Sequence, residues 1–152
     1  MTTEQCLMTW LLVGCLSFPL VTQAQVRVPE IADPSLPDIA MVRPDPTHGA
    51  VIIYNPVYCQ QIGQACGFFR AHEYGHVALG HHLRHPAHYP AQREAEADCW
   101  AAHHAHPYEI LAAYQLFMSG HSSHNWQIYG HPQQRAERVR QCALQAGRWI
   151  GH

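Results

Sequence analysis

The sequence FFRAHEYGHVALGHH occupies residues 68–82, and at its centre lies HEYGH, residues 72–76. On an α-helix, residues four apart are separated by about 40° around the axis, so His72 and His76 project from one face. Two imidazoles placed in this way can bind the same metal ion. Glu73 projects about 100° from His72, which lets it hold a water molecule without ligating the metal. The HExxH pattern is therefore typical of a zinc hydrolase whose glutamate is the general base.

A third ligand is needed to make this interpretation specific. The chain contains 14 histidines among 152 residues, so an HExxH sequence can arise here by chance. A catalytic zinc ion is held by three protein side chains, and the fourth position is left for water. Glu94 and Glu96 follow His76 by 18 and 20 residues, within the segment REAEAD. Both are candidate third ligands from a later helix.

The overall composition fits one modest domain. Of the residues, 47% are hydrophobic and 13% are charged, which is enough for a small core. The formal net charge of −2 gives no basic surface of the kind that nucleic acids require. A nucleic-acid partner is therefore not predicted.

The N-terminus has the pattern of a targeting segment. An apolar run over residues 7–21 is followed by Thr-Gln-Ala, which favours a signal peptide over residues 1–24 and export to the bacterial periplasm or secretion. A run of about 15 apolar residues is short for a membrane span, so no stable span is predicted in the mature chain. Residues 12–15, LVGC, also resemble a lipobox, and the alternative is a lipoprotein acylated on Cys15.

Four cysteines follow the predicted signal peptide, namely Cys59, Cys66, Cys99 and Cys142. Four cysteines in a small exported chain predict two disulfides, with three possible connectivities. The short spacing of Cys59 and Cys66 favours a local bridge, which leaves Cys99 to pair with Cys142. Free buried thiols are the alternative, and a cysteine-ligated zinc is disfavoured because no CxxC pair is present.

The sequence of the mature chain predicts a mainly α fold with a short β element. This α+β domain is expected over residues 50–152. Residues 25–49 form a Pro-rich segment that we expect to be extended or disordered. A pro-segment that places Asp33, Asp38 or Asp45 on the metal is the functional alternative to a plain linker. The expected elements are a strand over residues 50–54, a short helix or turn over 56–63, and helices over 64–80, 91–105, 108–118 and 132–146.

Two local features bear on how the site is built. Gly75 costs about 1 kcal/mol relative to alanine inside a helix, so it indicates that another element packs closely there. The strand over residues 51–54 is predicted to be an edge along which an extended substrate could pair.

Three motifs together resemble a known family. They are the HExxH helix, the E-x-x-x-D pattern of Glu94 and Asp98, and His131-Pro132-x-x-Arg135 at the start of a late helix. This combination resembles the gluzincin metallopeptidases of the CAAX-prenyl-protease type and their small soluble relatives, the minigluzincins. The resemblance extends over about residues 51–139. It covers only the catalytic core, a minimal zincin domain, because the membrane-embedded members also have transmembrane helices.

The resemblance implies a ligand set and a base. His72, His76 and Glu94 would bind Zn²⁺, and Glu73 would be the general base. Asp98, one turn after Glu94, would accept a hydrogen bond from the free ring N–H of a ligand histidine.

The resemblance also brings the start of the late helix near the metal. His131 or Tyr129 would then donate a hydrogen bond to the developing oxyanion, and His131 is the candidate named in the family motif. A position packed on Trp126, at the beginning of the helix, is the alternative for His131.

A metzincin arrangement is a second possibility for the ligand set. It would place the third ligand at His82, ten residues after His72. That arrangement needs a glycine where this chain has Leu79, and the glycine comes one place later, at Gly80. The remaining histidines are expected at the surface, and they are His85, His88, His103, His104, His106, His121, His124 and His152.

The predicted function is a zinc-dependent peptidase that acts on peptide or protein substrates. The alternative from another class is a non-catalytic, His-rich periplasmic zinc-binding protein. A third possibility is a degenerate gluzincin that serves as a binding module, although no ligand or base is missing from the pattern.

Overall fold

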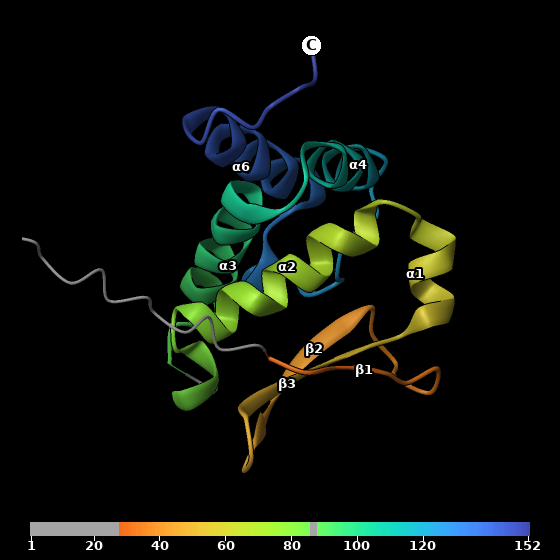
Figure 1. Ribbon diagram of the computed structural model, residues 1–152. Helices are drawn as coiled ribbons and strands as arrows, with labels where there is room; N and C mark the ends of the chain where they lie inside the picture. The colour runs from red at the N-terminus through yellow and green to blue at the C-terminus, as the bar shows by residue number, and fades with distance from the viewer. Residues whose placement is uncertain (1–27, 86–87) are drawn as a thin grey trace, which may run out of the picture.

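A computed structural model describes residues 28–85 and 88–152. They form a mainly helical α+β fold with one small sheet, which confirms the predicted fold class (Figure 1). The predicted signal peptide and lipobox lie outside the described residues. Within the described residues, no helix has both the length and the apolar character that crossing a bilayer requires.

The sheet contains β1 (Glu30–Ala32), β2 (Ala40–Asp45) and β3 (Gly49–Tyr54) in the order β1-β3-β2. The central strand β3 pairs in parallel with β1 and antiparallel with β2. Both outer strands come from the Pro-rich segment, and Pro44 is accommodated because β2 lies at an edge.

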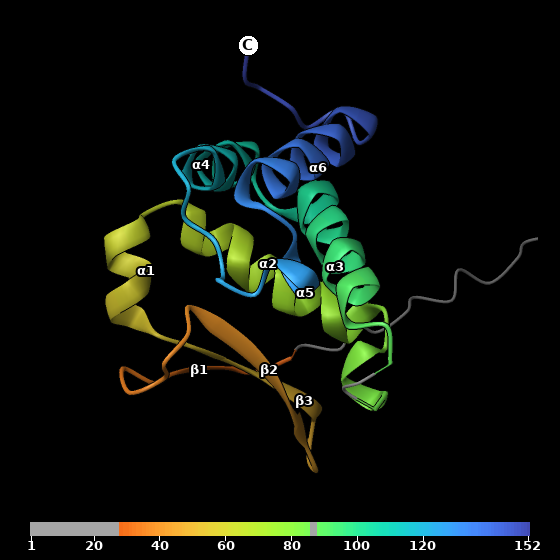
Figure 2. The same ribbon diagram turned by 180° about the vertical axis from the view of Figure 1, so that it is seen from behind.

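Two expectations about this region are corrected by the sheet. The Pro-rich segment is extended, but it is part of the domain, since strands from it flank β3 on both sides. The boundary predicted at residue 50 therefore falls inside the sheet. The strand over residues 51–54 is central rather than an edge, and the edge nearest the helices is β2 (Figure 2).

The helices are α1 (Pro56–Ile62), α2 (Ala65–Ala78), α3 (Pro90–His104), α4 (Pro107–Met118), α5 (Trp126–Tyr129) and α6 (Pro132–Gln145), with a 3₁₀ turn at His81–Leu83. Four of them begin with proline, whose fixed φ and missing N–H suit the first helical position. The predicted long helices agree with α2, α3, α4 and α6. The 3₁₀ turn and α5 lie between the predicted helices, where the sequence predicts no element, because elements this short have no readable periodicity.

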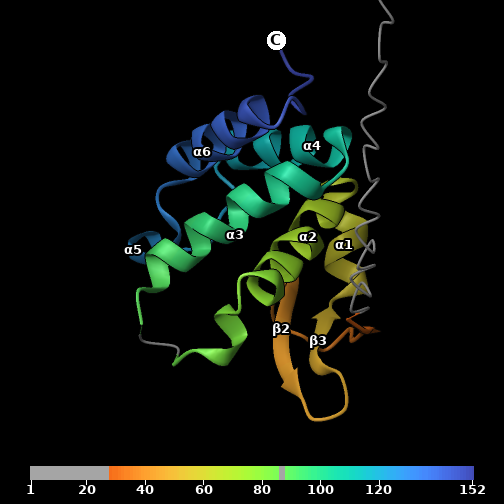
Figure 3. The same cartoon turned by 60° about the vertical axis from the view of Figure 1, so that its left-hand side comes forward.

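Helix α2 occupies the centre of the molecule, with the sheet on one side and α3, α4 and α6 on the other (Figures 1 and 3). Phe68 of α2 is fully buried against Phe117 of α4, with ring centroids 6.2 Å apart in an edge-to-face arrangement. At Gly75, an added Cβ would lie 3.1 Å from Trp100 Cβ and 3.2 Å from the Ala97 backbone. Helix α3 therefore crosses α2 closely at this glycine, as predicted.

Both predicted disulfides are present. Cys59–Cys66 joins α1 to α2, and Cys99–Cys142 joins α3 to α6. Two disulfides in a small domain fit an oxidising, extracytoplasmic compartment.

The two bridges are expected to differ in their effect on stability, because the bridge closing the longer loop restricts the unfolded chain more. The sequence separations are 43 residues for Cys99–Cys142 and 7 for Cys59–Cys66. The double variant Cys99→Ala/Cys142→Ala should lose about 4 kcal/mol of unfolding free energy, against about 2.5 kcal/mol for Cys59→Ala/Cys66→Ala. Denaturant unfolding measures both, and a larger loss from the short bridge would contradict the expectation.

Candidate metal centre

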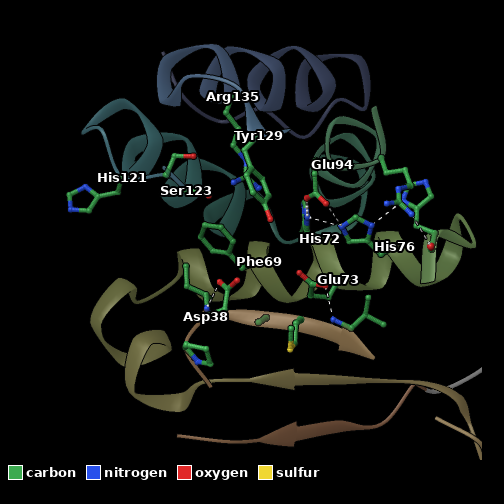
Figure 4. A pocket seen from close by; sticks show the side chains of 18 of the residues that line it. Asp38, Phe69, His72, Glu73, His76, Glu94, His121, Ser123, Tyr129 and Arg135 are labelled. Carbon is green, nitrogen blue, oxygen red and sulfur yellow. Dashed lines mark hydrogen bonds and ion pairs between the residues drawn. The ribbon is translucent and has the colours of Figure 1, made fainter. Parts of the chain in front are cut away.

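A cleft of about 1020 Å³ runs along α2, between β2 and the helices on the other side (Figure 4). Val42 of β2 donates its N–H to Glu73 of α2 over 2.8 Å, so the strand lies directly beside the HExxH segment. Phe69, which precedes this segment in the chain, and His82, which follows it, also line the cleft. The HExxH residues His72, Glu73 and His76 therefore line this cleft together with residues that precede and follow them in the chain.

Three side chains converge at this point. His72, His76 and Glu94 each present one ligand atom, and these atoms all lie within 4.8 Å of one another. His72 Nε2 is 3.0 Å from Glu94 Oε2 and 3.1 Å from His76 Nε2. His76 Nε2 is 3.5 Å from Glu94 Oε1. Tetrahedral bonds of about 2.0–2.1 Å separate neighbouring ligand atoms by about 3.3 Å, so this group could hold a metal ion.

Local packing explains why the three residues meet. The helical spacing places both histidines on the face of α2 that α3 crosses. The close approach at Gly75 brings α3 to this face near Ala97, and Glu94 lies one turn earlier on α3. The fold therefore brings together the three residues that were preferred as ligands from the sequence.

Asp98 lies behind the ligand group and orients His72. Its carboxylate is fully buried, and Oδ1 is 2.9 Å from His72 Nδ1. Arg135 donates to both oxygens over 2.8 and 2.9 Å, and Arg138 donates to Oδ2 over 2.7 Å. Burial raises the pKa of Asp98, but the Arg135 guanidinium and His72 outweigh it and hold this pKa well below its usual range. Asp98 therefore lies one hydrogen bond behind His72, a candidate ligand.

The charges around His72 favour a cation between two carboxylates. Burial lowers the pKa of His72, but hydrogen bonds to Asp98 and Glu94 outweigh it and raise this pKa to about 9. Burial raises the pKa of Glu94, but hydrogen bonds to His72 and His76 lower it to about 2. A metal ion bound at Nε2 would supply the positive charge that a proton otherwise supplies.

Glu73 lies beside this group without belonging to it. One carboxylate oxygen accepts the N–H of Val42, and burial raises the pKa of the Glu73 carboxyl above its usual value. A raised pKa makes the carboxylate a stronger base toward a neighbouring water molecule.

Of the two candidates for an oxyanion donor, the structure brings Tyr129 to the cleft. Its side chain extends from α5 toward the ligand group (Figure 4). Burial and the carboxylates of Glu94 and Asp38 raise the pKa of Tyr129 to about 12, so the hydroxyl remains a donor. His131 is exposed at the start of α6, with its ring 4.1 Å from that of Trp126. It is not among the described residues that line the cleft.

The alternative ligands lie outside the convergent group. The Glu96 carboxylate accepts from Gln92 and lies 3.0 Å from His81 Nε2. His82 lines the cleft, but its Nδ1 is 3.4 Å from the carbonyl oxygen of His76.

The acidic residues of the Pro-rich segment likewise lie apart from this group. Asp33 and Asp45 accept hydrogen bonds within their own turns, whereas Asp38 lines the cleft. Within the part of the chain that the structure describes, the convergent group comprises only the residues preferred from the sequence.

His81 is the residue that sequence reasoning missed. It follows the helix predicted over residues 64–80 and was assigned no role, but it is buried, and its Nδ1 lies 3.0 Å from Nδ1 of His76. The available signal was Gly80, which adopts a φ of 68° just after α2. A glycine in this left-handed conformation reverses the chain, so the next residue can fold back on the last helical turn.

Comparisons with protein-family models, with curated proteins and with solved structures found no match. The function is therefore argued from the geometry and chemistry of the site.

Asp98→Asn should destabilise the fold, because it leaves two guanidinium groups next to a neutral amide. The expected loss is about 3–5 kcal/mol of unfolding free energy at neutral pH, the usual cost of removing one partner of a buried ion pair. The pKa of Asp98 is lower in the folded than in the unfolded chain. Its stabilising effect is therefore full above the unfolded value of about 4 and is lost as pH falls below that value.

The loss of unfolding free energy is measured by denaturant unfolding at a series of pH values. The control is Glu137→Gln, a change on the exposed side of α6. The difference between wild type and Asp98→Asn should shrink as the solution is acidified. A difference that stays below about 0.5 kcal/mol at neutral pH would contradict the structural role of Asp98.

Proposed function

We propose that this chain is a zinc-dependent peptidase of the gluzincin type, related in its catalytic core to the CAAX-prenyl-protease family and the minigluzincins. One observation carries the proposal. His72, His76 and Glu94 form a convergent ligand group, and the carboxylate of Glu73 lies beside it inside the cleft. A metal site with only a structural role is normally closed by four protein ligands.

The donor set supports zinc. Two imidazole nitrogens and one carboxylate are the ligands of a known class of catalytic zinc site, with the fourth position open to water. A zinc ion in this group would polarise a carbonyl oxygen and lower the pKa of a bound water molecule.

The protein groups around the ligands fit peptide hydrolysis. Glu73, held by the Val42 N–H, would take a proton from the attacking water and then deliver it to the leaving amine. Tyr129, whose hydroxyl stays protonated, would donate a hydrogen bond to the oxygen of the tetrahedral intermediate.

The edge of β2 is the proposed binding strand for the substrate backbone. The N–H of Val42 points toward α2, because it bonds to Glu73 rather than to β3. Backbone groups of alternate residues on a strand point the same way, so those of Ala40 also face the cleft. An extended peptide could pair with this edge and pass the ligand group.

The rival function is a non-catalytic zinc-binding protein of the periplasm. Such a protein needs the three ligands but has no use for Glu73 as a base. The effect of removing this carboxylate alone therefore separates the two functions.

The test is zinc quantification combined with digestion of a peptide library by the mature protein. Wild type should contain one zinc ion per chain and cleave peptides. Glu73→Gln should retain zinc and lose activity by about 10²–10⁴-fold, the usual contribution of a general base. Glu94→Ala should lose zinc, and Glu137→Gln should match wild type in both measurements.

Two results would overturn the proposal. Cleavage that persists in Glu73→Gln with zinc bound would contradict the role of this glutamate as base. Zinc binding by wild type without cleavage of any peptide in the library would favour the non-catalytic function.

A further inference from the structure

A chain of three side chains leads from the ligand group to the surface. Nδ1 of His76, the ring nitrogen that faces away from the ligand group, lies 3.0 Å from Nδ1 of His81. His81 is only 4% exposed, and its Nε2 lies 3.0 Å from Oε2 of Glu96. The side chain of Glu96 is 42% exposed, and its other oxygen accepts from Gln92 over 2.7 Å.

One arrangement of protons satisfies every atom in this chain. A histidine that ligates a metal through Nε2 carries its proton on Nδ1. The Nδ1–H of His76 can donate to His81 only if Nδ1 of His81 is the acceptor. Neutral His81 then carries its proton on Nε2, which donates to the carboxylate of Glu96.

We propose that His81 and Glu96 are positioning residues of the metal centre. They hold His76 in the Nδ1–H tautomer and fix the orientation of its ring, and they thereby strengthen binding of a divalent metal ion. The inference rests on the role of His76 as a metal ligand in the proposed function, and it does not depend on peptidase activity.

The two ligand histidines are thus held in different ways. His72 bonds directly to Asp98, a fully buried carboxylate that also pairs with two arginines. His76 reaches its carboxylate through a second imidazole, and that carboxylate lies at the surface. Substitution of Glu96 therefore leaves the helix-joining contacts of Asp98 in place.

The experiment measures the dissociation constant for zinc alone, by competition with a chromophoric chelator at neutral pH, in the full mature chain. His81→Leu fills the space without providing an acceptor and should weaken zinc binding about 10–100-fold. His81→Asn returns an amide oxygen near the position of Nδ1 and should restore most of the affinity. Glu96→Ala should weaken binding less than His81→Leu, and Glu96→Gln, which keeps an acceptor, should remain closer to wild type.

Three further measurements make the result specific. The melting temperature of each metal-free variant reports folding separately from metal affinity. Glu137→Ala, a change at an exposed carboxylate on α6, should leave zinc binding unchanged. The ¹⁵N shifts of His81 in the zinc-loaded protein should identify the Nε2–H tautomer.

Each outcome supports or overturns the inference. If folded His81→Leu binds zinc with wild-type affinity, His81 only packs in the core and the inference is overturned. If that variant does not fold, unchanged affinity in Glu96→Ala overturns the inference instead. A wild type that binds no zinc overturns both this inference and the proposed function. If the variants show the expected order of zinc affinities but the wild type cleaves no peptide, the inference is supported and only the peptidase function is overturned.

Discussion

The buried ion pair between Asp98 and Arg135 is the interaction on which the rest of the structure depends. Asp98 lies on α3, Arg135 on α6, and the same carboxylate bonds to His72 on α2. One fully buried side chain therefore joins three helices and also aims a candidate metal ligand. Removing it would therefore disturb the core and the candidate site together.

The disulfide between Cys99 and Cys142 supports the same helix pair. Cys99 follows Asp98 directly in α3, and Cys142 lies two turns after Arg135 in α6. The covalent bridge and the ion pair thus hold α3 against α6 at two points. This arrangement keeps Glu94, in the N-terminal half of α3, at a fixed distance from the histidines of α2.

Residues governed by helical periodicity could be predicted from the sequence. Two histidines four apart share a face of any helix, and Glu94 and Asp98 share a face by the same rule. Gly75 predicted that another element packs closely on this helix, because a glycine inside a helix is costly unless packing requires it, and that element is α3. For the disulfides, the short spacing of Cys59 and Cys66 favoured a local bridge, which left Cys99 to pair with Cys142, and both bridges are present.

Features that depend on the path of the chain between elements could not be predicted. His81 enters the site because the chain turns back at Gly80, and the histidine itself carries no periodic signal. The Pro-rich segment forms two strands because the backbone groups of β3 can pair on both of its sides. Prolines are compatible with the edge strands that result. His131 and Tyr129 are only two residues apart, yet the short helix α5 directs Tyr129 into the cleft while His131 packs on Trp126.

The most direct test of the metal centre is the zinc K-edge absorption spectrum of the zinc-loaded protein. Two imidazole nitrogens and a carboxylate should produce a shell of nitrogen and oxygen scatterers at about 2.0–2.2 Å, with outer-shell scattering from two histidine rings and no sulfur at about 2.3 Å. Scattering from three or four histidine rings, or from sulfur, would contradict the ligand set of His72, His76 and Glu94.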